Sequence, residues 1–174
     1  MKILIVTKVY LPSVGGMEKY AFIMADTFHN MGHNVVVLTE ERSESNDSNS
    51  FKIVRTNYFL KDIIYYTRRA DVCIISGFSL KYFPFTLFNS KNILVFHNPN
   101  FGNNWQSHIK QFIAKFPIPN VINVMVSNYV GKSLRLKRYK TIYNPYENDL
   151  FRMYDNSYDR KGFIYVGRIC EDKG

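Results

Sequence analysis

Cysteine is scarce in this sequence, since only Cys73 and Cys170 occur among its 174 residues. Cys73 lies in an apolar run and Cys170 in a predicted loop, a pattern that indicates neither a disulfide framework nor a metal site. No apolar run reaches the roughly 18 residues that a membrane-spanning helix needs. Long glycine, serine or proline tracts are also missing, and 46% of the residues are apolar. These absences exclude a disordered tail and a membrane-spanning protein, and they predict a globular domain.

Acidic side chains are missing from a long part of the chain. No Asp or Glu occurs from Val72 through Tyr146, whereas these 75 residues hold nine Lys or Arg, and the net charge of the sequence is +9. Five of the nine stand close together: Lys132, Arg135, Lys137, Arg138 and Lys140. Such a surface favours phosphate groups on a nucleotide, a lipid headgroup or a nucleic acid. A solvated basic face that only aids solubility remains the alternative.

The first residues, MKILIVTKVYLP, resemble a signal peptide only in part. Lys8 interrupts the apolar run and no cleavage site with small residues follows. We therefore interpret the segment as a strand, and we expect the protein to stay in the cytoplasm.

The rest of the chain alternates between strand and helix patterns around a polar loop at 40–50. The predicted strands are Lys2–Val6, Asn34–Leu38, Phe51–Arg55, Val72–Ile75, Asn92–Phe96, Val121–Val126 and Lys140–Tyr143. The predicted helices are Met17–Met31, Phe59–Arg69, Ser79–Phe88, a helix carrying Trp105, Ile109, Phe112, Ile113 and Phe116 that stops at Pro117, and one that runs from the N-cap Ser127 to about Leu136. This alternation predicts an α/β fold, a Rossmann-like parallel sheet with helices on both faces.

Ligands of such sheets bind where the strands end, so the loops at that edge are the candidate sites. The loop from Tyr10 to Glu18 holds Gly15 and Gly16 before a predicted helix, and free N–H groups at the helix start attract anions. The dinucleotide spacing G-x-G-x-x-G is absent, which argues against an epimerase or another dinucleotide enzyme. A plain turn is the alternative for this loop.

His97 follows another predicted strand directly. It could donate to a sugar hydroxyl or accept a proton, although a loop histidine without chemistry is the alternative. The tripeptide Gly131-Lys132-Ser133 imitates the end of a P-loop, but the first glycine of that motif is missing and the tripeptide falls inside a helix pattern. The remaining histidines show no ligand spacing, so no metal site is predicted.

The C-terminal part reads as the start of a second domain. Phe163–Val166 has the composition of a buried strand, and Arg168 and Lys173 follow it, where cations suit an anion. Residues 144–151, which begin with Asn144-Pro145, resemble a linker that leaves the first domain.

Six segments in this order resemble the group 1 (family 4-like) retaining glycosyltransferases of the GT-B fold. They are PSVGGME at 12–18, GHNVVVLT at 32–39, the histidine at 97, VSNYV at 126–130, IYNPYENDLF at 142–151 and VGRICEDKG at 166–174. The resemblance implies an N-terminal acceptor-binding domain at 1–150 and, at 151–174, the hinge and first strand of a truncated donor-binding domain.

The resemblance also implies roles for single residues. Gly15 and Gly16 would lie near the donor phosphates, with Glu18 and Asn144 at the acceptor or cleft side. His97 would be the catalytic residue, next to the donor sugar. Arg168 and Lys173 would neutralise the departing diphosphate, so that neither a metal nor a cofactor is needed beside the nucleotide-sugar. Asn98, where an acid is common, and Asp172, where Glu is usual, depart from the family pattern.

The implied function is sugar transfer from a nucleotide-sugar donor to a glycan or a lipid-linked acceptor in polysaccharide or glycolipid biosynthesis. Because the family's donor domain carries paired glutamates that this sequence does not supply, we expect the chain as given to be inactive. The alternative is a non-enzymatic Rossmann module that binds phosphates or nucleic acid, supported by the basic balance alone. Under the glycosyltransferase hypothesis, in contrast, we expect no nucleic-acid partner.

A membrane contact is a separate hypothesis. Trp105, Phe112 and Phe116, together with Lys110 and Lys115, could dock on an anionic bilayer at the inner face of the membrane. The alternative is that these aromatic residues pack on the sheet.

Overall fold

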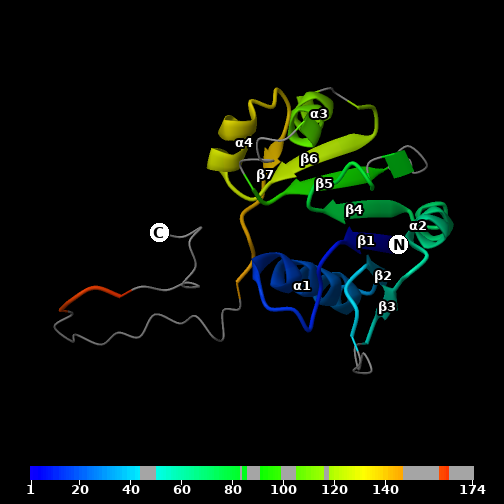
Figure 1. Ribbon diagram of the computed structural model, residues 1–174. Helices are drawn as coiled ribbons and strands as arrows, with labels where there is room; N and C mark the ends of the chain where they lie inside the picture. Colours follow the sequence, from blue (N-terminus) through cyan, green and yellow to red (C-terminus); the bar gives the residue numbers. More distant parts are fainter. Residues whose placement is uncertain are drawn as a thin grey trace.

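The computed structural model describes residues 1–43, 50–82, 84–85, 91–98, 105–115, 118–146 and 161–164, without the side chains of 106 and 107. Its centre is one parallel sheet of seven strands in the order β3-β2-β1-β4-β5-β6-β7 (Figure 1). The strands are β1 (Lys2–Thr7), β2 (Asn34–Thr39), β3 (Lys52–Arg55), β4 (Val72–Ser76), β5 (Asn92–Phe96), β6 (Val121–Met125) and β7 (Lys140–Thr141). The sheet confirms the predicted Rossmann-like α/β fold.

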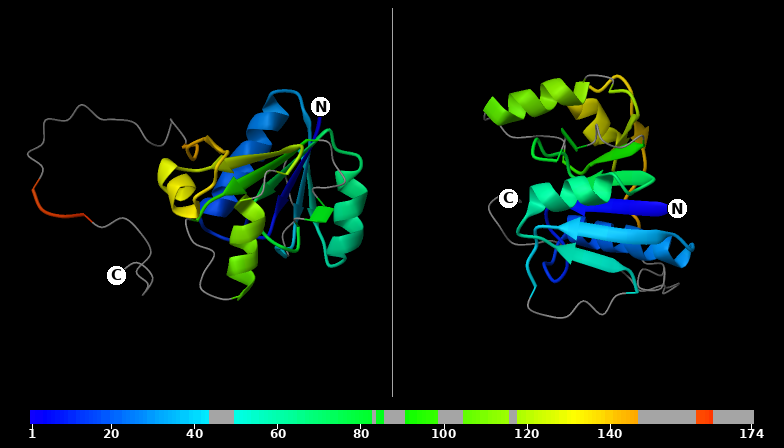
Figure 2. Two further views of the ribbon diagram at one scale, coloured as in Figure 1. Left: turned by 90° about the horizontal axis from the view of Figure 1, so that it is seen from above. Right: turned by 90° about the vertical axis from the view of Figure 1, so that its right-hand side faces the viewer.

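The helices divide between the two faces of the sheet (Figure 2). The helix α1 (Gly16–Asn30) covers one face, and α2 (Phe59–Thr67), α3 (Trp105–Lys115) and α4 (Asn128–Leu134) cover the other. Right-handed crossovers explain this division, because the chain moves one way from β1 to β2 and the opposite way from β3 to β4 and on to β7. The prediction of helices on both faces is confirmed.

Two apolar clusters, one on each face, form the core. Ile3, Ile5, Val35 and Val37 lie with Ala21 and Ala25 of α1 in one cluster. Leu4, Val6 and Leu38 lie with Phe59 and Ile63 of α2 in the other, which also reaches Ala114 and Leu134. Successive strand residues thus point to opposite faces, and both faces are apolar, as expected of a parallel sheet covered on both sides.

The helix predicted at Ser79–Phe88 is not formed in its described part. Leu80–Tyr82 make a turn and Pro84–Phe85 a short 3₁₀ turn. Pro84 has no N–H to donate to Leu80, and Tyr82 is instead directed into the core. The prediction was wrong because the apolar residues of this segment serve a turn that packs inward.

The predicted strand Phe163–Val166 is described at Phe163 and Ile164 only. Both residues are exposed and neither is in a strand. An apolar run of this kind becomes a strand only beside a partner, and every strand of the described sheet belongs to β1–β7. The prediction was therefore wrong for these two residues, and Val166 lies outside the described part of the chain.

The helix α4 (Asn128–Leu134) confirms the prediction that Gly131 lies in a helix. Ser127 is its N-cap, with the Val130 N–H donating to the Ser127 hydroxyl over 3.3 Å. Gly131 lies inside this helix and not in a phosphate-binding loop.

Among the described residues, no helix is long and apolar enough to span a bilayer.

Candidate functional site at the carboxyl edge of the sheet

The strand order reverses between β1 and β4, and this switch point is where ligands of such sheets bind. The two strands pair in parallel from Ile3 with Val72 to Thr7 with Ser76. The predicted glycine loop leaves β1 there, and β4 ends at Ser76 beside it. His97 follows β5, which is the next strand on. The fold therefore brings the glycine loop and His97 to one edge of the sheet.

The loop between β1 and α1 is fixed by residues of the neighbouring strands. The guanidinium of Arg55 donates to the Leu11 carbonyl over 2.7 Å and to the Glu41 carbonyl over 3.0 Å. The Ser13 hydroxyl donates to the Glu41 carboxylate over 2.7 Å. These contacts connect the loop to the ends of β2 and β3, so the start of α1 is held in a defined position.

The two glycines of this loop differ in their surroundings. A Cβ atom on Gly15 would lie 2.4 Å from the Glu18 carboxylate, whereas a Cβ on Gly16 would meet nothing within 4 Å. The Glu18 carboxylate thus lies over the start of α1, where the partial positive charge of the helix favours an anion. Open space remains on the Gly16 side, which leaves room for a ligand there.

His97 is held by the end of the neighbouring strand. Its Nε2 atom lies 3.0 Å from the Ser76 hydroxyl, and its ring meets the ring of Tyr20 edge-on at 4.8 Å between centroids. Burial lowers the pKa of His97 to about 4. The imidazole is therefore neutral at pH 7, and it acts there as a hydrogen-bonding group more readily than as a cation.

Gly77 lets α1 approach the end of β4. Its φ is +86°, and a Cβ atom would lie 2.9 Å from the methyl group of Met17 in the first turn of α1. The Gly77 N–H donates to the Val95 carbonyl over 2.9 Å. A side chain at this position would be strained and would push against α1, so glycine is what lets the first turn of α1 lie against the end of β4.

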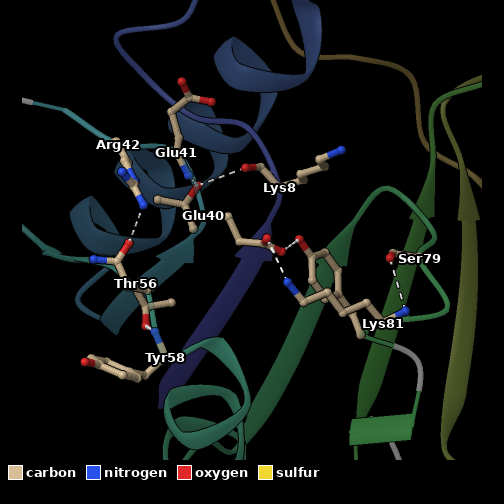
Figure 3. A network of polar contacts seen from close by, with 11 residues as sticks. Lys8, Glu40, Glu41, Arg42, Thr56, Tyr58, Ser79 and Lys81 are labelled. Carbon is tan, nitrogen blue, oxygen red and sulfur yellow. Dashed lines mark hydrogen bonds and ion pairs between the residues drawn. The ribbon is translucent and has the colours of Figure 1, made fainter.

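A second polar centre lies at the same edge, on the α2 side of the sheet (Figure 3). The Lys81 ammonium lies 2.8 Å from the Glu40 carboxylate, and the Tyr82 hydroxyl donates to it over 2.5 Å. Glu40 follows β2 and Lys81 follows β4, so the ion pair passes over the end of β1, which lies between these strands. We call Glu40, Lys81 and Tyr82 the β2–β4 bridge.

The groups of this bridge shift one another's pKa values. Burial alone would raise the pKa of the Glu40 carboxyl, but hydrogen bonds from Lys81 and Tyr82 and the positive charges of Lys81 and Lys8 together lower it. Burial, and then the hydrogen bond to Glu40 and its negative charge, raise the pKa of Tyr82. Glu40 is thus ionised and Tyr82 protonated at neutral pH, so the bridge is a stable donor–acceptor network.

The segment after β7 returns across the carboxyl edge towards α1 (Figure 1). Tyr143 and Pro145 line an apolar hollow of about 290 Å³ together with Tyr20, Met24 and Phe28 of α1. Asn144 lies between these two residues of the exit segment and is exposed. Because Tyr20 also contacts His97, the exit segment passes close to the candidate site.

The structure places only some of the predicted site residues, and their roles stay predictions. Gly15, Gly16, Glu18 and His97 lie at the predicted edge, whereas Arg168 and Lys173 lie outside the described residues. Sequence reasoning missed the residues that support the site, which are Ser13, Tyr20, Glu40, Arg55, Ser76, Gly77, Lys81 and Tyr82. Of these residues, the sequence could have indicated Ser76 most directly, because it is the polar residue that ends an otherwise apolar strand.

Within the described residues, no group of three His, Cys, Asp or Glu side chains is placed to hold a metal ion. Burial raises the pKa of the Cys73 thiol to about 12, which keeps it protonated inside the core. Metal independence stays a prediction.

The chain matches no family model and no curated protein. Its structure is similar to that of an α-glucosyltransferase solved with UDP and a 13-mer DNA containing an HMU base, with a TM-score of 0.53 and 15% identity over 84% of this chain and 43% of that chain. An α-glucosyltransferase solved with UDP-glucose and DNA containing an abasic site gives a TM-score of 0.50 and 16% identity, over 83% of this chain and 42% of that chain. A UDP-N-acetylglucosamine 4-epimerase from Bacillus cereus gives a TM-score of 0.44 and 11% identity, over 72% of this chain and 53% of that chain. A TM-score this low supports no conclusion.

At these identities the similarity concerns the fold alone. The described unit has a Rossmann-like α/β fold. The chain spans less than half the length of the two glucosyltransferases. Any activity of a whole protein of that kind is therefore a proposal for this chain.

Proposed function

We propose that the described unit is the acceptor-side domain of a retaining glycosyltransferase that uses a nucleotide-sugar. The observation that carries the proposal is the pairing of Ser76 with His97 beside the open start of α1, at the switch point of the sheet. A neutral imidazole suits a sugar hydroxyl, and the partial positive charge at the start of a helix suits a diphosphate; a nucleotide-sugar carries both groups.

The fold similarity supports the same function. Of the α-glucosyltransferases compared above, one was solved with UDP, the nucleotide part of a sugar donor, and the other with the complete donor UDP-glucose. The acceptor of this chain would be a glycan or a lipid-linked molecule in polysaccharide or glycolipid biosynthesis, at the inner face of a membrane. Transfer would require a donor-binding domain in addition to the described unit.

Within this proposal each site residue has a chemical task. His97 would contact the donor sugar near its reacting carbon, with Ser76 setting the direction of the ring. Gly16 and the start of α1 would face the phosphates. Arg168 and Lys173 would neutralise the charge that grows on the leaving diphosphate, which is why we expect no metal and no further cofactor.

A binding module without catalysis is the second candidate. The basic region of the sequence favours it, and the two glucosyltransferase complexes contain DNA. A nucleic-acid contact would give a gel shift that weakens steeply with salt. Without such a shift, the nucleotide-sugar proposal stands as the better one.

The direct test is an NMR titration of the 174-residue chain with UDP-glucose, GDP-mannose and, as a comparison, NAD. We expect weak binding of a nucleotide-sugar, with a Kd of ~1 mM or weaker, and shifts at the amides of Gly15, Gly16 and Gly77 and at the His97 ring. His97→Gln should reduce these shifts, whereas His108→Gln, a change of an exposed histidine on α3, should not. Shifts confined to the opposite edge of the sheet, or caused by NAD alone, would contradict the proposal.

A further inference from the structure

The apolar stripe of α3 faces outward. Trp105 is 69% exposed, Ile109 37% and Phe112 64%, whereas Ala114 is only 6% exposed. At 100° per residue, the first three residues share one side of the helix and Ala114 lies on the opposite side. The smallest apolar residue of α3 thus packs on the sheet, and its largest ones meet water. This outcome contradicts the reading in which Trp105 and Phe112 pack against the sheet; Phe116 lies outside the described residues.

Basic residues lie at the C-terminal end of α3. Lys115, at the last position of α3, lines a hollow of about 530 Å³ with Lys137 and Arg138 from the turn before β7. Lys140 lines a neighbouring hollow of about 410 Å³, which shares Lys137 and Arg138. The residues that line the two hollows include no acid, and the whole sequence from 72 to 146 contains none. We call Trp105, Ile109, Phe112, Lys115, Lys137, Arg138 and Lys140 the α3 surface.

We propose that the α3 surface docks the protein on an anionic lipid bilayer. Exposed Trp, Ile and Phe side chains insert at the boundary between headgroups and acyl chains, and cations beside them attract anionic headgroups. The hollow between Lys115, Lys137 and Arg138 suits the phosphate of such a headgroup. A nucleic acid would use the cations alone, without a reason for an outward stripe that includes isoleucine, so the combination favours a bilayer.

The position of α3 connects this surface with the candidate site. A crossover helix runs antiparallel to the strands that it joins, so α3 starts towards the carboxyl edge and ends towards the amino edge (Figure 2). Trp105 therefore lies towards the carboxyl edge and Lys115 towards the amino edge, so docking along the whole of α3 would place both edges beside the lipid headgroups. The inference rests in this respect on the lipid-linked acceptor of the proposed function, but vesicle binding is measured without any sugar, so the two ideas can fail separately.

Trp105 is the only tryptophan of the sequence and reports on the surface directly. The fluorescence of the 174-residue chain is recorded with vesicles of phosphatidylcholine alone and with vesicles that also contain phosphatidylglycerol. We expect a blue shift of the emission and co-sedimentation with the anionic vesicles only, both weakened by salt. An unchanged emission and equal, negligible sedimentation with both kinds of vesicle would overturn the proposal, and this result needs no variant.

Two variants separate the contributions. Lys137→Ala combined with Arg138→Ala should lower the affinity for anionic vesicles roughly thirtyfold, and Phe112→Ser should reduce the blue shift of Trp105. The matched control carries Leu60→Ser and Lys61→Ala, which change an exposed apolar residue and an exposed cation of α2. If the control loses as much binding as the variants, or if the variants lose DNA binding while the wild type binds no vesicles, the bilayer proposal is wrong.

Discussion

The Ser76 hydroxyl and Nε2 of His97, 3.0 Å apart, join the ends of two adjacent parallel strands, β4 and β5. Ser76 is itself buried, so its hydroxyl has little access to water. The hydrogen bond therefore sets the direction of the imidazole. We regard Ser76 as a positioning residue for His97.

Ser76→Ala should destabilise the fold by about 1–2 kcal/mol, because it leaves a partly buried ring nitrogen without its partner. The variant should also change the chemical shift of the His97 ring at constant pH, which a simple loss of packing would not do. Urea unfolding and NMR of the imidazole measure the two effects. Ser133→Ala, at an exposed position of α4, is the control and should change neither.

The pH dependence of stability should carry the signature of His97. Its pKa is about 4 in the folded protein against an ordinary value of 6.5, so the unfolded chain binds the extra proton first. The contribution of His97 is thus complete above pH 6.5 and is lost as the pH falls towards 4, by at most about 1.4 kcal/mol per pH unit.

Urea unfolding at pH 7 and pH 5 tests this effect. The wild type should lose more stability between the two values than His97→Gln does, whereas His108→Gln should follow the wild type. Equal pH dependence in the wild type and in His97→Gln would contradict the burial of His97.

The sheet and its helices could be predicted because their signals are local. Apolar strands such as Asn92–Phe96 alternate with helix patterns, and Ser127 predicts the start of α4 by a short-range hydrogen bond. The turn around Pro84 and the outward stripe of α3 could not be predicted in this way. Periodicity shows that a helix has an apolar side, but it does not show whether that side meets the sheet or the solvent.

The polar pairs at the carboxyl edge were hidden from the sequence for another reason. Ser76 and His97 are 21 positions apart, and Glu40 and Lys81 are 41 apart. Only the order of the strands brings such residues together, and many orders are compatible with the same alternation of strand and helix. The glycine loop was easier to place, since its residues are neighbours in the sequence at one strand end.

The β2–β4 bridge should derive more stability from Tyr82 than from Lys81. Tyr82→Phe removes a hydroxyl that donates to Glu40 from a buried ring and should cost about 1–2 kcal/mol. Lys81→Met removes an ion pair whose lysine is half exposed and should cost less than about 1 kcal/mol. Thermal unfolding of the two variants, and of the double variant, gives the comparison; a larger cost for Lys81→Met would mean that the ion pair dominates the bridge.

Gly131→Ala should destabilise the protein although it places a better helix former inside α4. The gain in helix propensity is about 1 kcal/mol, but a Cβ atom there would lie 2.4 Å from the ring of Tyr139. Overpacking of this kind costs about 1–3 kcal/mol, so a net loss is expected. Denaturant unfolding measures this loss, and adding Tyr139→Leu to Gly131→Ala should recover part of it by shortening the side chain that blocks the new methyl group.

Gly16→Ala, at the start of α1 with open space around it, is the matched control and should leave the stability nearly unchanged. Equal stability of Gly131→Ala and the wild type would show that Tyr139 can move aside at no cost, and that the glycine is not needed for the contact between α4 and the segment before β7.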